Sequence, residues 1–111
     1  MTQYLSSNED VDAWLAEPGP RWLMKHSNSC GISTTAFDEV QAHAETHPTE
    51  PLAVVVIQEH RPVSNYIATK LGRVHQSPQL FLCVDGAVVW TTTHFSITAQ
   101  AMAEAWAAQA G

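Results

Sequence analysis

The chain has 111 residues, 45% of them hydrophobic, with five basic and 11 acidic residues and a formal net charge of −6. This size suits one compact α/β or similar domain, and we expect a single domain over residues 1–111 that needs neither metal nor disulfides for its core. The negative charge argues against nucleic-acid binding, and the longest apolar run, Leu52 to Ile57, is too short to span a membrane. We therefore expect a cytoplasmic protein with no nucleic-acid or membrane partner.

The first half of the chain predicts a helix, a strand, a second helix and a second strand. Ser7 or Asn8 can cap the first helix, which Pro18-Gly19-Pro20 ends. A strand over about residues 21–26 leads through a polar loop to a helix that begins near Cys30 and is closed by His47-Pro48. The run Leu52 to Ile57 is typical of a buried parallel strand.

The second half predicts a helix, a hairpin and a last helix. Pro62 suits the first position of a helix, and Asp85-Gly86 joins strands 80–84 and 87–92 in a tight hairpin. Ser96 is expected to cap the last helix. This order is that of the thioredoxin fold, so we predict an α/β protein with a central four-stranded mixed sheet in the order 2-1-3-4, flanked by helices, and an extra N-terminal helix.

The charges are unevenly distributed along the chain. Residues 21–37 and 60–84 contain no Asp or Glu, and they hold every basic residue: Arg21, Lys25, Arg61, Lys70 and Arg73. Such windows can attract an anion or can form an ordinary solvated surface, and the sequence leaves both interpretations open.

Cys30 lies inside the first of these windows and begins the motif Cys30-Gly31-Ile32-Ser33. A cysteine at a helix start faces unpaired backbone N–H groups and the positive end of the helix, which stabilise a thiolate. The spacing is that of a C-x-x-C redox site whose second cysteine is a hydroxyl, which predicts one-thiol exchange. Ser33 either bonds the Cys30 sulfur or caps the helix. Lys25 and His26 are candidates to support the thiolate, although a structural role for His26 is favoured.

Pro78 and Cys83 belong to the third predicted strand. A cis Ser77–Pro78 bond would expose backbone groups to a partner chain, but most such bonds are trans, so the sequence alone leaves the isomer open. Cys83 lies five residues beyond Pro78, roughly 16 Å along a strand, which is too far for it to pair with Cys30. We expect Cys83 to be a buried apolar residue.

Several segments resemble the monothiol bacilliredoxins, the YtxJ-like family: Lys25 to Ser33, Arg61 to Ala68, Ser77-Pro78-Gln79, and Trp90 with His94 to Ile97. The resemblance covers nearly the whole chain and implies a thioredoxin-like fold. It also implies removal of the small thiol bacillithiol from proteins that carry it as a mixed disulfide. Its implied partners are S-bacillithiolated proteins and bacillithiol as a thiol co-substrate, with no tightly bound cofactor.

This resemblance also implies the residues that meet the substrate. Bacillithiol carries a malate, and the candidate donors to its carboxylates are Lys25, Arg61 and the helix N-termini at Cys30 and Pro62. Arg61 can equally be a surface residue beside a helix start. The residues expected to contact substrate are Asn28, Gly31, Ile32, Arg61 and Ser77.

Other functions stay open at this point. The family usually has proline where Gly31 stands, and the glycine makes the motif similar to the Cys-Gly-Phe-Ser motif of monothiol glutaredoxins, which hold iron–sulfur clusters with glutathione. An iron–sulfur carrier and a non-catalytic thioredoxin-like interaction module are therefore the alternatives. No metal site is expected. Four residues could act as zinc ligands, but no two of them are as close in the sequence as the ligands of a zinc site usually are: His26, Cys30, His75 and Cys83.

Overall fold

Five strands form one mixed sheet in the order β1-β3-β2-β4-β5 in the computed structural model, which describes residues 2–110. The strands are β1 (Thr2–Tyr4), β2 (Pro20–His26), β3 (Leu52–Val56), β4 (Gln79–Val84) and β5 (Ala87–Thr93). The helices are α1 (Asn8–Ala16), α2 (Gly31–Thr46), α3 (Arg61–Leu71), the 3₁₀ helix η1 (His94–Ser96) and α4 (Ala99–Ala110).

The prediction of a four-stranded sheet is wrong, because β1 adds a fifth strand at the edge beside β3. The four predicted strands do lie next to one another as β3-β2-β4-β5, with β2 parallel to β3 and antiparallel to β4. β1 spans three residues and pairs Thr2 to Tyr4 with Leu52 to Val54. So short an edge strand has no periodicity of its own, and its pairing depends on an edge that β3 provides.

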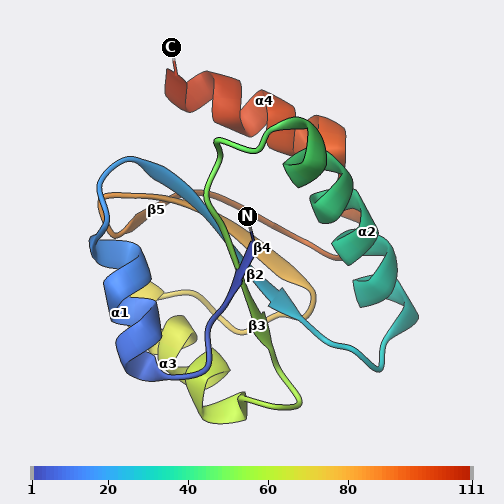
Figure 1. Ribbon diagram of the computed structural model, residues 1–111. Helices are drawn as coiled ribbons and strands as arrows, with labels where there is room; N and C mark the ends of the chain where they lie inside the picture. The colour runs from blue at the N-terminus through green and yellow to red at the C-terminus, as the bar shows by residue number, and fades with distance from the viewer. Residues whose placement is uncertain (1, 111) are drawn as a thin grey trace.

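Helices cover both faces of the sheet and create two hydrophobic cores (Figure 1). α1 and α3 cover one face, and α2 and α4 cover the other. Because side chains alternate along a strand, Leu23 of β2 packs in the α1–α3 core while Trp22 and Met24 pack in the α2–α4 core. Adjacent residues of β2 therefore pack in opposite layers, and His26, the last residue of the strand, lies on the α2 side against Phe37.

Local signals explain most of the element boundaries. The Ser7 side chain accepts a hydrogen bond from Asp10 N and caps α1, and Gly72 ends α3 in the left-handed conformation. The predicted hairpin is confirmed, with positive φ at both Asp85 and Gly86. Ser96 was expected to cap the last helix, but it lies in η1.

Thr98 takes the capping position of α4 instead. Its hydroxyl accepts a hydrogen bond from Ala101 N at 3.0 Å, and its carbonyl accepts one from Met102 N. The 3₁₀ helix η1, which begins at His94 with positive φ, lies between β5 and α4, so α4 starts later than the sequence predicts. The expectation for Ser96 is thus wrong by two positions, and the capping chemistry is unchanged.

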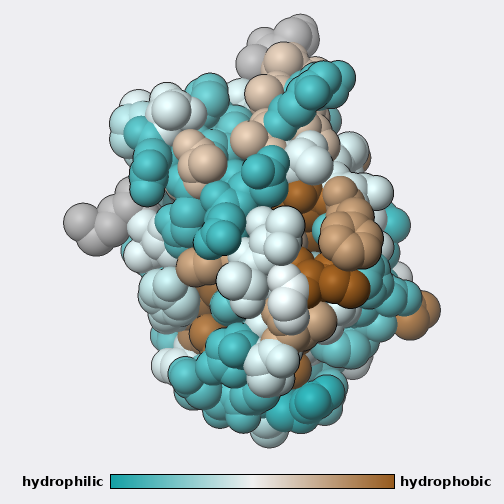
Figure 2. Space-filling view, turned by 90° about the vertical axis from the view of Figure 1, so that its right-hand side faces the viewer, coloured by the Kyte–Doolittle hydropathy of each residue, from teal (hydrophilic) through white to brown (hydrophobic). Residues whose placement is uncertain are grey.

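The surface on the α2 side is mostly hydrophilic, with apolar side chains gathered on one part of it (Figure 2). Across the described residues, none of the helices is both long enough and apolar enough to cross a bilayer. The exposed large apolar side chains are Tyr4, Val74, Val89 and Phe95.

Candidate active site

Cys30 is the N-cap of α2 and lies at the C-terminal end of β2. It has extended backbone angles (φ −118°, ψ 127°), and its carbonyl accepts the first helical hydrogen bond, from Thr34 N at 3.0 Å. Its side chain makes no capping hydrogen bond, and the thiol is free and half-buried. The first N–H groups of a helix have no intrahelical partner, so a free sulfur at this position lies where those groups can act on it.

Ser33 does not act as the cap of its own helix. Its buried hydroxyl oxygen accepts from Ser27 N at 2.9 Å and lies 2.9 Å from His26 Nδ1. These bonds tie the first turn of α2 to the end of β2 and hold the loop that precedes Cys30. The ring of His26 also stacks on Phe37, with centroids 4.4 Å apart. His26 is thus placed structurally, as favoured above, and burial lowers the pKa of its imidazole despite the opposing charge of Asp38.

Gln58, which the sequence analysis did not single out, holds the same loop from the other side. It follows β3, and its side-chain amide donates to the hydroxyls of Ser27 and Ser29, the latter at 2.7 Å. Its carbonyl oxygen accepts from Asn28 N at 3.1 Å. One glutamine therefore fixes all three residues before Cys30. A lone Gln in a loop gives no sequence signal, because its partners lie about 30 positions away.

Ser77 and Pro78 come to the same end of the sheet. Lys25 pairs with Gln79 across β2 and β4, so Pro78 lies one position beyond this pair, opposite His26. The Ser77–Pro78 peptide bond is cis, and the Pro78 carbonyl accepts from His94 N at 3.2 Å. The fold therefore brings the Ser77–Pro78 turn to the strand end that leads into the Cys30 loop.

Lys25 is fully buried, on the face of β2 that packs toward α3. Its ammonium lies 3.1 Å from His75 Nδ1, and Ser64 Oγ lies 3.3 Å from the same nitrogen. Burial lowers the pKa of Lys25 to about 8. The side chain has no access to solvent, so the expectation that it donates directly to a carboxylate of a bound thiol is wrong.

The other predicted contact residues lie on the surface around Cys30 or near it in the fold. Gly31 is exposed and Ile32 half-buried in the first turn of α2, Asn28 is exposed in the loop, and Arg61 is exposed at the start of α3. A side chain at residue 31 would meet nothing within 4 Å, so the fold does not require glycine there.

The basic residues do not all gather near Cys30. Arg21 lies at the opposite end of β2 with its guanidinium 3.9 Å from the centre of the Trp14 ring, and Lys70 forms a 2.9 Å ion pair with Asp12. With Lys25 buried, Arg61 is the predicted anion donor that remains exposed at the start of a helix. The segments 21–37 and 60–84, which lack acidic residues, therefore suggest more positive charge near Cys30 than the structure places there.

Cys83 is buried in β4 with 1% of its surface exposed, as predicted. Burial raises the pKa of its thiol to about 11, which keeps it protonated near neutral pH. The expected packing role of the tryptophans is also confirmed, because Trp22 stacks on Trp106 and meets Trp90 edge to face. Of the two cysteines, Cys30 is consequently the accessible one.

Comparisons with known proteins identify the family and the fold of this chain. The family model described as "Monothiol bacilliredoxin BrxC" matches residues 3–102. The chain belongs to the monothiol bacilliredoxin family. A solved structure described as a candidate oxidoreductase with a thioredoxin fold is 31% identical, with a TM-score of 0.87 over 94% of this chain and 92% of that one.

Two thioredoxins share the fold at low identity. The thioredoxin of Fasciola hepatica is 15% identical, with a TM-score of 0.78 over 96% of this chain and 98% of that one. The thioredoxin of Malassezia sympodialis is 10% identical, with a TM-score of 0.79 over 100% of this chain and 92% of that one. The bacilliredoxin chain therefore has a thioredoxin-like fold, and its family membership supports a thiol redox function.

Proposed function

We propose that this protein removes bacillithiol from S-bacillithiolated proteins through a mixed disulfide on Cys30. The observation that carries the proposal is the placement of one free, half-exposed thiol at the N-cap of α2, while the other cysteine is buried in β4. A chain with one accessible thiol can exchange disulfides with an external thiol but has no internal partner with which to resolve them.

The exchange conserves one disulfide in each step. The Cys30 thiolate attacks the bacillithiol sulfur of the mixed disulfide, the old S–S bond breaks, and the substrate protein leaves as a thiolate. Cys30 then carries bacillithiol. A second low-molecular-weight thiol, as its thiolate, attacks that bacillithiol sulfur, which releases the Cys30 thiolate and a disulfide of two small thiols. The first N–H groups of α2 lie where they can bond to the Cys30 sulfur when it leaves with the negative charge.

The residues around Cys30 support these steps in different ways. Ser33 and Gln58 hold the loop that presents the sulfur. Ser77 and Pro78 border the strand end beside it, where an incoming chain would lie. Arg61, exposed at the start of α3, is the candidate donor to the carboxylates of bacillithiol.

Intact-mass spectrometry tests the proposal with an S-bacillithiolated model protein as substrate. The wild type and the matched Cys83→Ala variant should each gain one bacillithiol while the substrate protein loses it, and Cys30→Ser should do neither. An S-glutathionylated substrate, run in parallel, distinguishes the small thiol. The proposal is rejected if Cys30→Ser carries the adduct and the wild type does not, or if the glutathione substrate reacts faster.

A further inference from the structure

A second cluster of chemistry-bearing side chains lies at the far end of α2, away from Cys30. His43 and His47 are one helical turn apart at the C-terminal end of α2, and Glu50 follows in the turn to β3. α2 has 16 residues, so this cluster lies roughly 24 Å along the helix from Cys30. The proposed exchange reaction uses none of these three residues.

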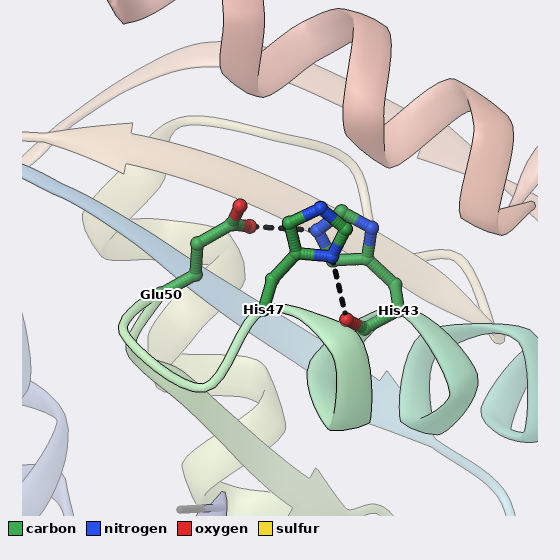
Figure 3. Close-up of side chains that lie close together, drawn as sticks. All are labelled: His43, His47 and Glu50. Atoms are coloured by element: carbon green, nitrogen blue, oxygen red, sulfur yellow. Dashed lines mark hydrogen bonds and ion pairs between the residues drawn. The ribbon is translucent and has the colours of Figure 1, made fainter.

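The three side chains converge on one another (Figure 3). One nitrogen or oxygen of each lies within 4.8 Å of those of the other two. His43 Nε2 is 2.7 Å from Glu50 Oε1, and both side chains are buried, with 2% and 6% of their surfaces exposed. His47 is half-buried and stacks on the ring of His43, with centroids 4.0 Å apart.

The hydrogen bonds around the cluster leave a ligand atom available on His47. Its Nδ1 lies 2.9 Å from Thr46 Oγ1 and 2.9 Å from the carbonyl oxygen of His43, which can only accept, and this geometry favours the tautomer with the proton on Nδ1 and the lone pair on Nε2. A histidine whose other nitrogen donates to a backbone carbonyl is the usual arrangement of a metal ligand.

Glu50 is oriented in a similar way. Its Oε1 accepts a 2.8 Å hydrogen bond from the indole N–H of Trp22, and its backbone N–H donates to the carbonyl of His47 across the turn. The carboxylate and the His47 ring are therefore brought together by a closed turn and not by a mobile loop. A surface pocket of about 210 Å³ borders Glu50.

We propose that His43, His47 and Glu50 form a site for a divalent transition-metal ion of the zinc class. Two imidazole nitrogens and one carboxylate oxygen are a ligand set that Zn²⁺ accepts, with water in the remaining position. A tetrahedral ion with bonds of about 2.0 Å needs ligand atoms roughly 3.3 Å apart. Because His43 Nε2 and Glu50 Oε1 are 2.7 Å apart, these two atoms must separate by a few tenths of an ångström to hold the ion, which replaces their direct contact.

Calorimetric titration with Zn²⁺ alone tests the site, using the full chain with Cys30→Ser so that the exposed thiol contributes nothing. We expect one ion per chain, and at least a roughly tenfold loss of affinity on His47→Gln or Glu50→Gln. Glu104→Gln, an exposed glutamate on α4 that does not line this pocket, is the control and should bind as the parent does. Thermal denaturation without metal checks that each variant folds.

Co²⁺ supplies a readout that needs no mutation of the cysteine. Bound at this site in the wild type, it should show the visible bands of a nitrogen and oxygen environment without the thiolate-to-cobalt charge-transfer band that Cys30 would add. The proposal is overturned if the parent chain binds no Zn²⁺, if His47→Gln binds it equally well, or if the Co²⁺ spectrum is that of a thiolate site.

Discussion

The two ends of α2 use polar side chains in opposite ways. At its start, Ser33 and Gln58 hold the preceding loop and leave the sulfur of Cys30 free and half-exposed. At its end, His43 and Glu50 are buried against Trp22 and bond to each other. A nucleophile must stay accessible to an external disulfide, whereas a buried polar pair is stable only if its hydrogen bonds are satisfied inside the protein.

At each end of α2, the hydrogen bonds around the polar side chains determine whether those side chains stay accessible. Buried polar groups hold the loop before Cys30 but leave its sulfur without a capping bond. Hydrogen bonds of the same kind at the other end pair His43 with Glu50 directly and hold His47 through its Nδ1. Reactivity at the first end and stability at the second are therefore separable by mutation.

Replacing Cys30 gives the largest expected effect. Cys30→Ser should abolish the release of bacillithiol from a protein substrate, because a hydroxyl does not enter disulfide exchange. Its free energy of unfolding should stay within about 0.5 kcal/mol of the wild type, since the side chain makes no capping bond. Cys83→Ala is the control and should keep the exchange rate. A Cys30→Ser protein that still turned over would place the reaction elsewhere.

The opposite pattern is expected at the other end of α2. His43→Leu should lower the free energy of unfolding by about 2 kcal/mol, because it removes a hydrogen-bond partner from the buried Glu50 carboxylate. The alkylation rate of Cys30 should not change. Urea denaturation at pH 7 measures the first effect, with His60→Leu, a half-exposed position, as control. Equal stability of His43→Leu and the control would show that the pair contributes nothing.

Lys25 lies on β2 near the reactive end and tests how burial acts there. Its folded-state pKa of about 8 is below the ordinary value of 10.5, so the unfolded chain binds a proton more tightly. The free energy of unfolding should therefore rise between pH 8 and pH 10.5 and lose this gain as the pH falls through 8.

Removing the ammonium should remove that pH dependence. At pH 7 we expect the free energy of unfolding of Lys25→Met to be about 2 kcal/mol higher than that of the wild type. Above pH 8 it should not show the increase expected of the wild type. Lys70→Met, an exposed lysine, is the control and should keep the rise. If Lys25→Met retains the same slope in denaturation curves across pH, another group causes it.

Replacing Gln58 should have a smaller effect, on both the free energy of unfolding and the exchange rate. Gln58→Ala removes the bonds to Ser27, Asn28 and Ser29, and we expect a loss of about 1 kcal/mol in the free energy of unfolding. The exchange rate should fall about fivefold, because the loop no longer fixes the position of the sulfur. Stopped-flow exchange assays measure this, and Glu59→Ala, at the next exposed residue, should leave the rate unchanged.

Gly31→Pro should have the smallest effect, and a favourable one. Gly31 is the first helical residue, where proline is tolerated, and the φ and ψ of Cys30 suit a residue that precedes proline. The variant should gain about 0.5 kcal/mol in the free energy of unfolding by restricting the unfolded chain. Gly31→Ala serves as the comparison, and a destabilised Gly31→Pro would mean that the N–H of residue 31 has an essential partner.

The sequence by itself determined the parts of this protein that depend on local pattern. Apolar spacing located the helices and four of the five strands, Asp85-Gly86 identified a hairpin, and the Cys30 motif pointed to one-thiol chemistry. The first helix was predicted to be capped by Ser7 or Asn8, and Ser7 is the cap. These signals are readable because helix and strand periods, caps and turns depend on residues a few positions apart. The same reasoning placed the cap of the last helix at Ser96, because it could not foresee the 3₁₀ turn before Thr98.

Only the tertiary structure decided which distant side chains meet. Pairing with β3 made a strand of Thr2–Tyr4, and the covering of both sheet faces buried Lys25 beside His75. The turn after α2 joined His43 to Glu50, although the spacing of His43 and His47 was already visible in the sequence. Contacts of this kind depend on the order of strands in the sheet and on which face a helix covers, which no short stretch of residues encodes.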